Sequence, residues 1–178
     1  MQVRVIDSDP ISVSRALDLG VDAICEDALL VTHQGDEGII CFNLILHHLV
    51  SDSEEKTRLL QVNALKAWKG TGAKLFVNEY IYESWCFDLS GKVIYLITKS
   101  PILSALGKFV SSLVPSLHAN TFGIGVRFRS SQEWRDIFTA EGFRVIREIE
   151  GDKEGISIPR RLLFIKTIKR NSFLLEID

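Results

Sequence analysis

The sequence predicts an α/β domain with a doubly wound, mostly parallel sheet, and three observations support this fold class. Short apolar stretches alternate with helix-like stretches as far as residue 79, which is typical of parallel strands joined by right-handed crossovers. The stretch 39–46 is almost continuously apolar, which indicates a strand covered on both faces. The length of 178 residues, with 46% hydrophobic residues, suits one domain with a substantial core.

The amino-terminal part is predicted to form a strand, a helix and a second strand. A β-branched strand at 3–6 ends in the turn sequence DSDP, where Ser8 or Asp9 can cap a helix. Gly20 can end that helix because glycine readily adopts the left-handed conformation found there. The second strand then follows at 21–25.

The middle of the chain repeats this order. After the apolar strand at 39–46, Ser53 begins a helix with two glutamates in its first turn, where they interact favourably with the helix dipole. Gly70 ends the helix, and residues 74–79 form a fourth strand. An amphipathic or largely buried helix is predicted further on, at 101–117.

The carboxyl-terminal part is predicted to contain one more helix and two more strands. Ser130 or Ser131 can cap the helix and Gly142 can end it. The strands follow at 143–149 and 161–168, separated by a loop.

Composition restricts the possible partners and compartments. The formal net charge of −2 gives no global reason to expect nucleic acid or a membrane as a partner. The amino terminus lacks the pattern of a signal peptide, and no stretch reaches the ~18 consecutive apolar residues that can span a bilayer. The three cysteines have no CxxC spacing, and two lie in apolar stretches, so we expect buried thiols rather than metal ligands. These features predict a cytoplasmic protein.

Several stretches, in this order, resemble the class I S-adenosylmethionine-dependent methyltransferases. They are "VRVIDSDP", "CEDALL", "FNLILHHLVSDSEE" and "ALKAWKGTGAKLFVNEY", followed by "RSSQEWRDIFTAEGFRVI" and "RRLLFIKT". The resemblance extends from about Val3 to about Ile168 and implies a Rossmann-like sheet with an antiparallel strand near the carboxyl terminus. It also implies a single domain over 1–178, with a helical, lid-like insert at about 85–127.

The resemblance implies a cofactor site for S-adenosylmethionine at the carboxyl ends of the first two strands. Asp7 matches the acid that binds the ribose hydroxyls, and a carboxylate can accept two hydrogen bonds from a diol. Asp27, with Glu26 as its competitor, would accept from the adenine amino group, and the backbone N–H of Ala28 would bind a ring nitrogen. The alternative for Asp7 is a turn and helix-capping residue before Pro10.

The adjacent histidines are the candidate catalytic residues. In small-molecule O-methyltransferases, a histidine near this place removes a hydroxyl proton, and a neutral imidazole can accept one at physiological pH. Neighbours on an extended segment point to opposite faces, so we expect one histidine to face the ligand, His48 before His47. The alternatives are a packing role or a metal site with Asp52 and Glu79, although no HxxxH spacing supports a metal.

One feature of the family is missing. The glycine-rich loop after the family's first strand has no counterpart, because the chain starts at the family's second strand and "GIG" at 123–125 comes too late. The missing strand would lie at the centre of the sheet, where unpaired backbone groups need partners. We therefore expect a rearranged strand order, an upstream segment that completes the sheet, or a homodimer.

The insert at 85–127 offers residues for a substrate. Arg127 and Arg129 could meet an anionic substrate or lie on a solvated strand edge. The candidate lining residues are Trp85, Phe87, Tyr95, Phe109, His118 and Phe122. The apolar residues of the predicted helix are alternatively ordinary helix core or a face for a partner, and they are Leu103, Leu106, Phe109, Val110 and Leu113.

The preferred function is S-adenosylmethionine-dependent methylation of a small molecule, with a hydroxyl as one acceptor. The alternative is a non-catalytic methyltransferase-like domain that acts through binding or oligomer assembly, which the missing glycine loop favours. A dinucleotide-binding oxidoreductase is a third option, but it needs the same absent loop.

Overall fold

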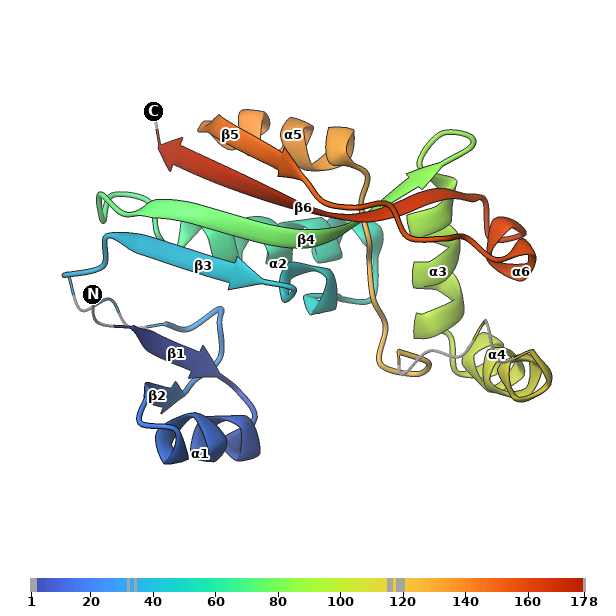
Figure 1. The fold of residues 1–178 in the computed structure, drawn as a ribbon, viewed down its shortest axis with the longest axis horizontal. Coiled ribbons are helices and arrows are strands. Elements are labelled where there is room, and N and C mark those ends of the chain that lie inside the picture. Colours follow the sequence, from blue (N-terminus) through green and yellow to red (C-terminus); the bar gives the residue numbers. More distant parts are fainter. Residues whose placement is uncertain (1–2, 32, 34, 115–116, 118–120, 178) are drawn as a thin grey trace.

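The computed structural model describes residues 3–31, 33, 35–114, 117 and 121–177 (Figure 1). It is a mixed α/β structure in which a strand–helix–strand order occurs twice in the first half of the chain. Its elements are β1 (Arg4–Asp7), α1 (Pro10–Asp18), β2 (Asp22–Cys25), β3 (Ile39–Asn43), the short 3₁₀ helix η1 (Leu46–His48), α2 (Glu54–Lys66), β4 (Lys74–Ser84), α3 (Leu89–Lys99), α4 (Pro101–Leu113), α5 (Ser131–Ala140), β5 (Phe143–Glu150), α6 (Ile158–Arg161) and β6 (Ile165–Ile177).

The strands form two sheets. Four strands lie in the order β3-β4-β6-β5, and β1 pairs with β2 in a separate parallel sheet. Strands β3 and β4 are parallel, whereas β6 runs antiparallel to both β4 and β5, which confirms the predicted antiparallel strand near the carboxyl terminus. Figure 1 shows β1 beside β3, on the side away from β4, with both arrows pointing the same way. Among the described residues no ladder joins these two strands.

Among the described residues, strand β3 pairs with a neighbour on one edge only, and one of its faces is exposed. The carbonyl of Gly38 accepts a hydrogen bond from the Lys74 amide at 3.0 Å, and the Leu44 amide donates to Asn78 at 2.8 Å. Backbone groups alternate between the two edges of a strand, so those of residues 39, 41 and 43 point away from β4. The side chains of the same three residues are exposed, and only the alternate ones pack inward. The prediction that this strand is covered on both faces was therefore wrong.

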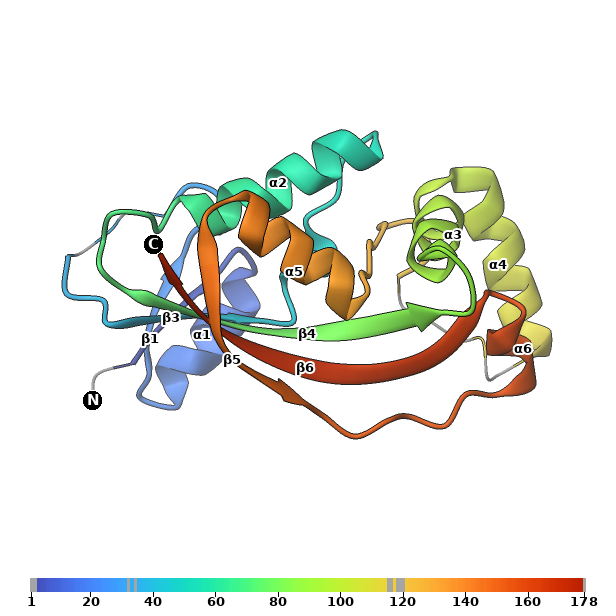
Figure 2. The ribbon, with the colours of Figure 1, turned by 90° about the horizontal axis from the view of Figure 1, so that it is seen from above.

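The main core lies between the four-stranded sheet and helices α2 and α5. Figure 2 shows both helices on the same face of the sheet. Alternate residues of β4 point into this core, and Leu75, Val77 and Ile81 are fully buried. Helix α5 contributes Trp134 and Phe138, whose rings stack at 5.6 Å. Burial of such side chains is the main contribution to folding free energy.

Local capping signals fix the helix starts as predicted. The Asp9 carboxylate accepts from the amides of residues 11 and 12 and caps α1. Ser53 caps α2 and accepts from the Lys56 amide. Ser130 and Glu133 form a reciprocal capping box at the start of α5. These three caps need only neighbours in sequence, which is why the sequence predicts them.

Several element boundaries and exposures differ from the prediction. Strand β3 ends at Asn43 because Leu44 has a positive φ of 57° and the chain turns into η1. Strand β4 continues to Ser84 because β6 pairs with it over this whole length, and β6 itself starts only at Ile165. Helix α3 was not predicted. Two of the three cysteines were expected to be buried, but all three are exposed. Cys25 and Cys41 lie in short strands at sheet edges, and Cys86 lies in a loop.

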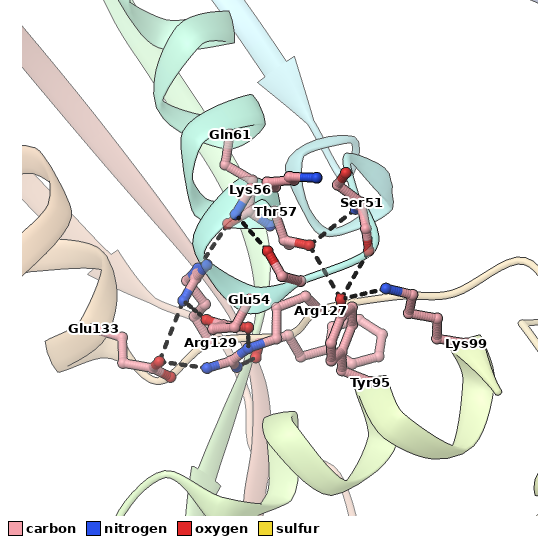
Figure 3. Close-up of polar contacts among 12 residues, drawn as sticks. Ser51, Glu54, Lys56, Thr57, Gln61, Tyr95, Lys99, Arg127, Arg129 and Glu133 are labelled. Carbon is pink, nitrogen blue, oxygen red and sulfur yellow. Dashed lines mark hydrogen bonds and ion pairs between the residues drawn. The ribbon is translucent and has the colours of Figure 1, made fainter.

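A buried cluster of charges connects α2, α5 and the segment before α5 (Figure 3). Arg127 is fully buried and its guanidinium donates to Glu54 at 2.8 Å and to Glu133 at 2.6 Å. Arg129 donates to Glu54 at 2.9 Å and to Gln61 at 2.7 Å. The prediction that these arginines meet a substrate or lie on a solvated strand edge is therefore wrong, since both are buried and paired with glutamates.

The cluster sets the ionisation of its members. Burial opposes the charged form of Glu54, but hydrogen bonds and charges from Arg127 and Arg129 outweigh it and lower its pKa. Burial, together with the charge of Arg127, lowers the pKa of Arg129. A buried ion pair is costly to break because the remaining partner keeps an uncompensated charge.

We predict that Arg127→Met destabilises the protein by roughly 3 kcal/mol, near the lower end for a broken buried pair because Glu54 is partly exposed. Urea denaturation at pH 7 measures this difference. It should shrink as the pH falls below the ordinary glutamate pKa of 4.5, because the lowered Glu54 pKa contributes stability only while the carboxylate is ionised. Arg144→Met, at the exposed pair with Glu176, is the control and should cost less than about 1 kcal/mol. Equal losses would contradict the structural role of the cluster.

We also predict that the free edge of β3 is visible in hydrogen exchange. In dilute protein, the amides of Cys41 and Asn43 should exchange rapidly, while those of Ile40 and Phe42, which face β4, should be protected. Residue-resolved exchange by NMR makes this comparison within one strand. Equal protection at all four amides in dilute protein would show that the edge is already paired.

Candidate functional site

A buried carboxylate on β4 holds the turn that carries the histidines. Glu79 is fully buried, and one of its oxygens accepts from the Leu46 amide at 2.7 Å. Its other oxygen lies 2.6 Å from Nδ1 of His47. The Leu46 carbonyl in turn accepts from the side-chain amide of Gln61 at 2.9 Å. Both backbone groups of Leu46 are thus bound by buried side chains, which fixes η1 in place.

His47 is enclosed on several sides. Its ring stacks on Phe128 with the centroids 4.8 Å apart, and Phe128 stacks in turn on Tyr82 at 4.2 Å. The His47 carbonyl accepts from the amide of Arg127 at 2.9 Å. With 5% of its surface exposed, His47 has little access to a ligand. Burial raises the pKa of Tyr82 to about 12, so this phenol stays neutral.

His48 is exposed and lies against His47, with the ring centroids 4.2 Å apart. Loss of water around the enclosed part of its ring lowers its pKa, the His47 ring lowers it further, and Glu79 partly opposes the shift. His48 is therefore a neutral base at physiological pH. The two histidines lie on a 3₁₀ turn, because β3 ends before them. The expectation that they point to opposite faces of an extended segment was wrong.

The loop after the histidines is fastened to α3, as Figure 3 shows. The hydroxyl of Tyr95 donates to the Ser51 carbonyl at 2.7 Å, and the Ser51 amide donates to Thr57 at 2.9 Å. Lys99 donates to the Tyr95 oxygen at 3.1 Å. These bonds join the loop to α2 and α3, so the histidine turn is held at both ends.

Asp7 and Asp27 lie at the same end of the two-stranded sheet. Asp7 is the last residue of β1 and is level with Cys25, and Asp27 follows β2 two residues later. One oxygen of Asp7 accepts from the Asp9 amide at 2.8 Å, and one oxygen of Asp27 accepts from the Leu29 amide at 2.9 Å. Asp9, not Asp7, caps α1, but the bond from the Asp9 amide to Asp7 is the turn contact that the local structural alternative for Asp7 predicts. Ala28 follows Asp27 and is partly buried.

The two groups of candidate residues share one edge of the molecule. Strands β1, β2 and β3 run parallel, and Figure 1 shows their carboxyl ends pointing the same way. The aspartates follow β1 and β2, and the histidines follow β3. In open α/β sheets, ligands bind beyond the carboxyl ends of parallel strands.

Other arrangements receive less support. The described residues contain no group of three His, Cys, Asp or Glu side chains placed to hold a metal ion, and Asp52 instead pairs with Lys56 at 2.8 Å. An open depression of about 420 Å³ lies at the opposite end of β4, beside Gly72 and Glu176, and contains none of the predicted site residues.

The insert forms α3 and α4, and its predicted lining residues have different environments. Tyr95 is buried, whereas Trp85, Phe87 and Phe109 are exposed by 59%, 90% and 63%. Phe122 is partly buried, and His118 lies outside the described residues. Sequence reasoning missed Gln61 and Phe128, because neither residue type at those positions signals a contact with a turn that is distant in sequence.

No protein-family model and no curated protein sequence matches this chain. Solved structures match it over 99% of its length at low identity. They include LepI in complex with SAH and a substrate analogue (9% identity, TM-score 0.55) and the [4+2]-cyclase SpnF (11%, 0.56). A SAM-dependent methyltransferase from Methanosarcina mazei matches with 10% identity and a TM-score of 0.57.

The chain spans 36% of the LepI chain, 66% of SpnF and 82% of the Methanosarcina protein. At these identities the likeness concerns the fold. The two sheets and the antiparallel strand β6 thus belong to a chain with a methyltransferase-like α/β fold.

Proposed function

We propose that this chain binds S-adenosylmethionine and methylates a small molecule, with a hydroxyl as the acceptor. The observation that carries the proposal is that Asp7, Asp27 and the histidine pair all follow the carboxyl ends of parallel strands in a methyltransferase-like fold. Among the structural neighbours, LepI was crystallised with SAM and with SAH, and OxaC with SAH and oxaline.

The cofactor would lie against the two-stranded sheet. The Asp7 carboxylate would accept hydrogen bonds from the ribose diol, and Asp27 would accept from the adenine amino group. The Ala28 amide would bind a ring nitrogen. Each carboxylate has one oxygen bonded within its own turn, which fixes the orientation of the other oxygen.

The acceptor would be activated by His48, with His47 and Glu79 behind it as positioning residues. His48 is exposed and neutral, as a general base must be, whereas His47 is enclosed and bonded to Glu79. Methyl transfer is an in-line displacement, so the protein mainly has to align the acceptor with the methyl group. The insert formed by α3 and α4 would act as the lid over this acceptor.

The proposal also requires a complete sheet. A further parallel strand between β1 and β3 would pair with their free edges and join the two sheets into one Rossmann-like, doubly wound sheet. An upstream segment or a second copy of the chain would supply it. A non-catalytic methyltransferase-like domain remains the alternative, and the cyclase SpnF shows that a related fold also serves other chemistry.

We predict that Asp7→Ala lowers the affinity for S-adenosylhomocysteine roughly 10-fold or more, because charge-assisted hydrogen bonds to the ribose are lost. The melting temperature should change little, since Asp7 is partly exposed at a strand end. Isothermal titration calorimetry measures the affinity, and Asp18→Ala, on the exposed part of α1, is the matched control. Unchanged affinity would remove Asp7 from the site, and no binding by the wild-type chain would refute the cofactor proposal.

We predict that His48→Gln lowers the rate of methyl transfer roughly 100-fold while cofactor affinity is unchanged. Transfer from methyl-labelled S-adenosylmethionine to a panel of phenols and alcohols measures this, with His33→Gln as control. In the wild type the rate should fall only as the pH drops below the His48 pKa, which lies below its ordinary 6.5. Glu79→Gln should move this acid limb to lower pH, because Glu79 raises the His48 pKa. An unchanged acid limb in His48→Gln would exclude it as the base.

A further inference from the structure

Helix α4 is oriented with its polar side inward. Its buried side chains are Ser104 and Ser111. One face of the helix carries large apolar residues, and these are exposed. They are Ile102 (80%), Leu103 (41%), Leu106 (57%), Phe109 (63%), Val110 (37%) and Leu113 (69%).

Hydrogen bonds fix this orientation. The Ser104 hydroxyl lies 2.7 Å from the Ile97 carbonyl and 2.9 Å from that of Thr98, and the Gly123 amide donates to it at 3.0 Å. Gly107 faces the ring of Phe122 so closely that a Cβ there would clash with it. The inward face is therefore built for small and polar residues, and the apolar stripe cannot turn inward without breaking these contacts.

The surroundings of α4 are basic. Residues 85–126 and 155–166 together contain six Lys or Arg and one Asp, whereas the whole chain contains 21 basic and 23 acidic residues. The remainder thus has 15 basic and 22 acidic residues. Figures 1 and 2 both place α3, α4 and α6 at one end of the molecule, away from the chain termini. Ile158 of α6 and Leu162, which directly follows this helix, are each 78% exposed and add to this end.

The exposed apolar residues of α4, which form an apolar stripe, and the basic charge around them together indicate the kind of partner. Two copies of the chain joined through this end would bring two positive surfaces together, which is unfavourable. An anionic lipid surface accepts both features, since acyl chains receive the apolar side chains and headgroups attract the lysines. We propose that α4 lies in the interfacial layer of an anionic membrane and docks this end of the protein on it. This docking does not depend on the proposed methylation.

The helix would lie on the membrane rather than cross it. No helix among the described residues is long and apolar enough to span a bilayer alone. Helices α3 and α4 pass that test only together, and they meet at a bend of 100°. Helix α3 is packed into the protein through Tyr95 and Thr98, so α4 is the part that is free to enter the interface.

Vesicle flotation tests the proposal with two kinds of vesicle. The first consists of phosphatidylcholine alone, and the second contains phosphatidylcholine and phosphatidylserine in equal parts. The full chain should bind the second kind and not the first, and added salt should weaken the binding. The double variant Leu106→Ser with Phe109→Ser should bind roughly 10-fold or more weakly, since two apolar side chains no longer enter the lipid. Ile11→Ser with Leu19→Ser, exposed on the other side of the molecule, is the matched control and should bind like the wild type.

A second pair of variants tests the charge. Lys92→Glu with Lys108→Glu should weaken binding to the phosphatidylserine vesicles roughly 10-fold or more. Arg15→Glu with Arg58→Glu changes the net charge equally at other exposed positions and should have a smaller effect. All substituted residues are exposed, so circular dichroism melting should show an unchanged fold.

Three results would overturn the proposal. The first is absence of wild-type binding to either vesicle, and the second is equal binding to both. The third is a wild-type dimer in light scattering that Leu106→Ser with Phe109→Ser converts to a monomer, without vesicle binding. That result would assign the apolar stripe to a second copy of the chain.

Discussion

The candidate site depends on one buried interaction, the hydrogen bonds that the Glu79 carboxylate accepts from the turn after β3. A buried carboxylate is costly unless its oxygens are bonded, and both oxygens of Glu79 have partners in η1. Because Asn78 pairs with Asn43, the next residue of β4 lies directly beside the point where β3 ends. The parallel pairing of β3 and β4 thus places the Glu79 carboxylate beside the turn. Because Glu79 binds the turn, the histidines are held at the carboxyl end of β3.

This interaction continues into a polar interior. Gln61 bonds Leu46 on one side and Arg129 on the other, and Arg129 leads to Glu54 and Glu133. The turn, α2 and α5 are therefore held together by directional bonds as well as by apolar packing. Such bonds fix geometry more tightly than apolar contacts, because each donor must meet its acceptor within a narrow range of distance and angle. The histidine turn is consequently coupled to the core of the domain.

Features that depend on contacts between residues close in sequence were predicted correctly, whereas features that depend on contacts between distant residues were not. The caps at Asp9, Ser53 and Ser130 involve neighbouring residues, and these predictions were confirmed. The burial of Arg127 was missed because its partner Glu54 lies 73 residues away. The orientation of α4 was left open for a similar reason, since its periodicity reveals two faces but not which one has partners in α3. The antiparallel strand near the carboxyl terminus followed from the resemblance, whereas the order of the strands and the role of Glu79 in binding η1 needed the structure.

The break between the two sheets connects the fold to the proposed chemistry. Asp7 and Asp27, which are proposed to bind the nucleoside part of the cofactor, lie at the end of the two-stranded sheet. His48 follows β3 of the four-stranded sheet. No ladder among the described residues fixes the distance between these sheets. A strand between β1 and β3 would fix it, because strands in a sheet are spaced at a constant ~4.8 Å. Cofactor binding and the geometry of methyl transfer would then both depend on that strand. A chain with a strand between β1 and β3 should therefore bind the cofactor more tightly and hold the methyl acceptor in line with the transferred methyl group.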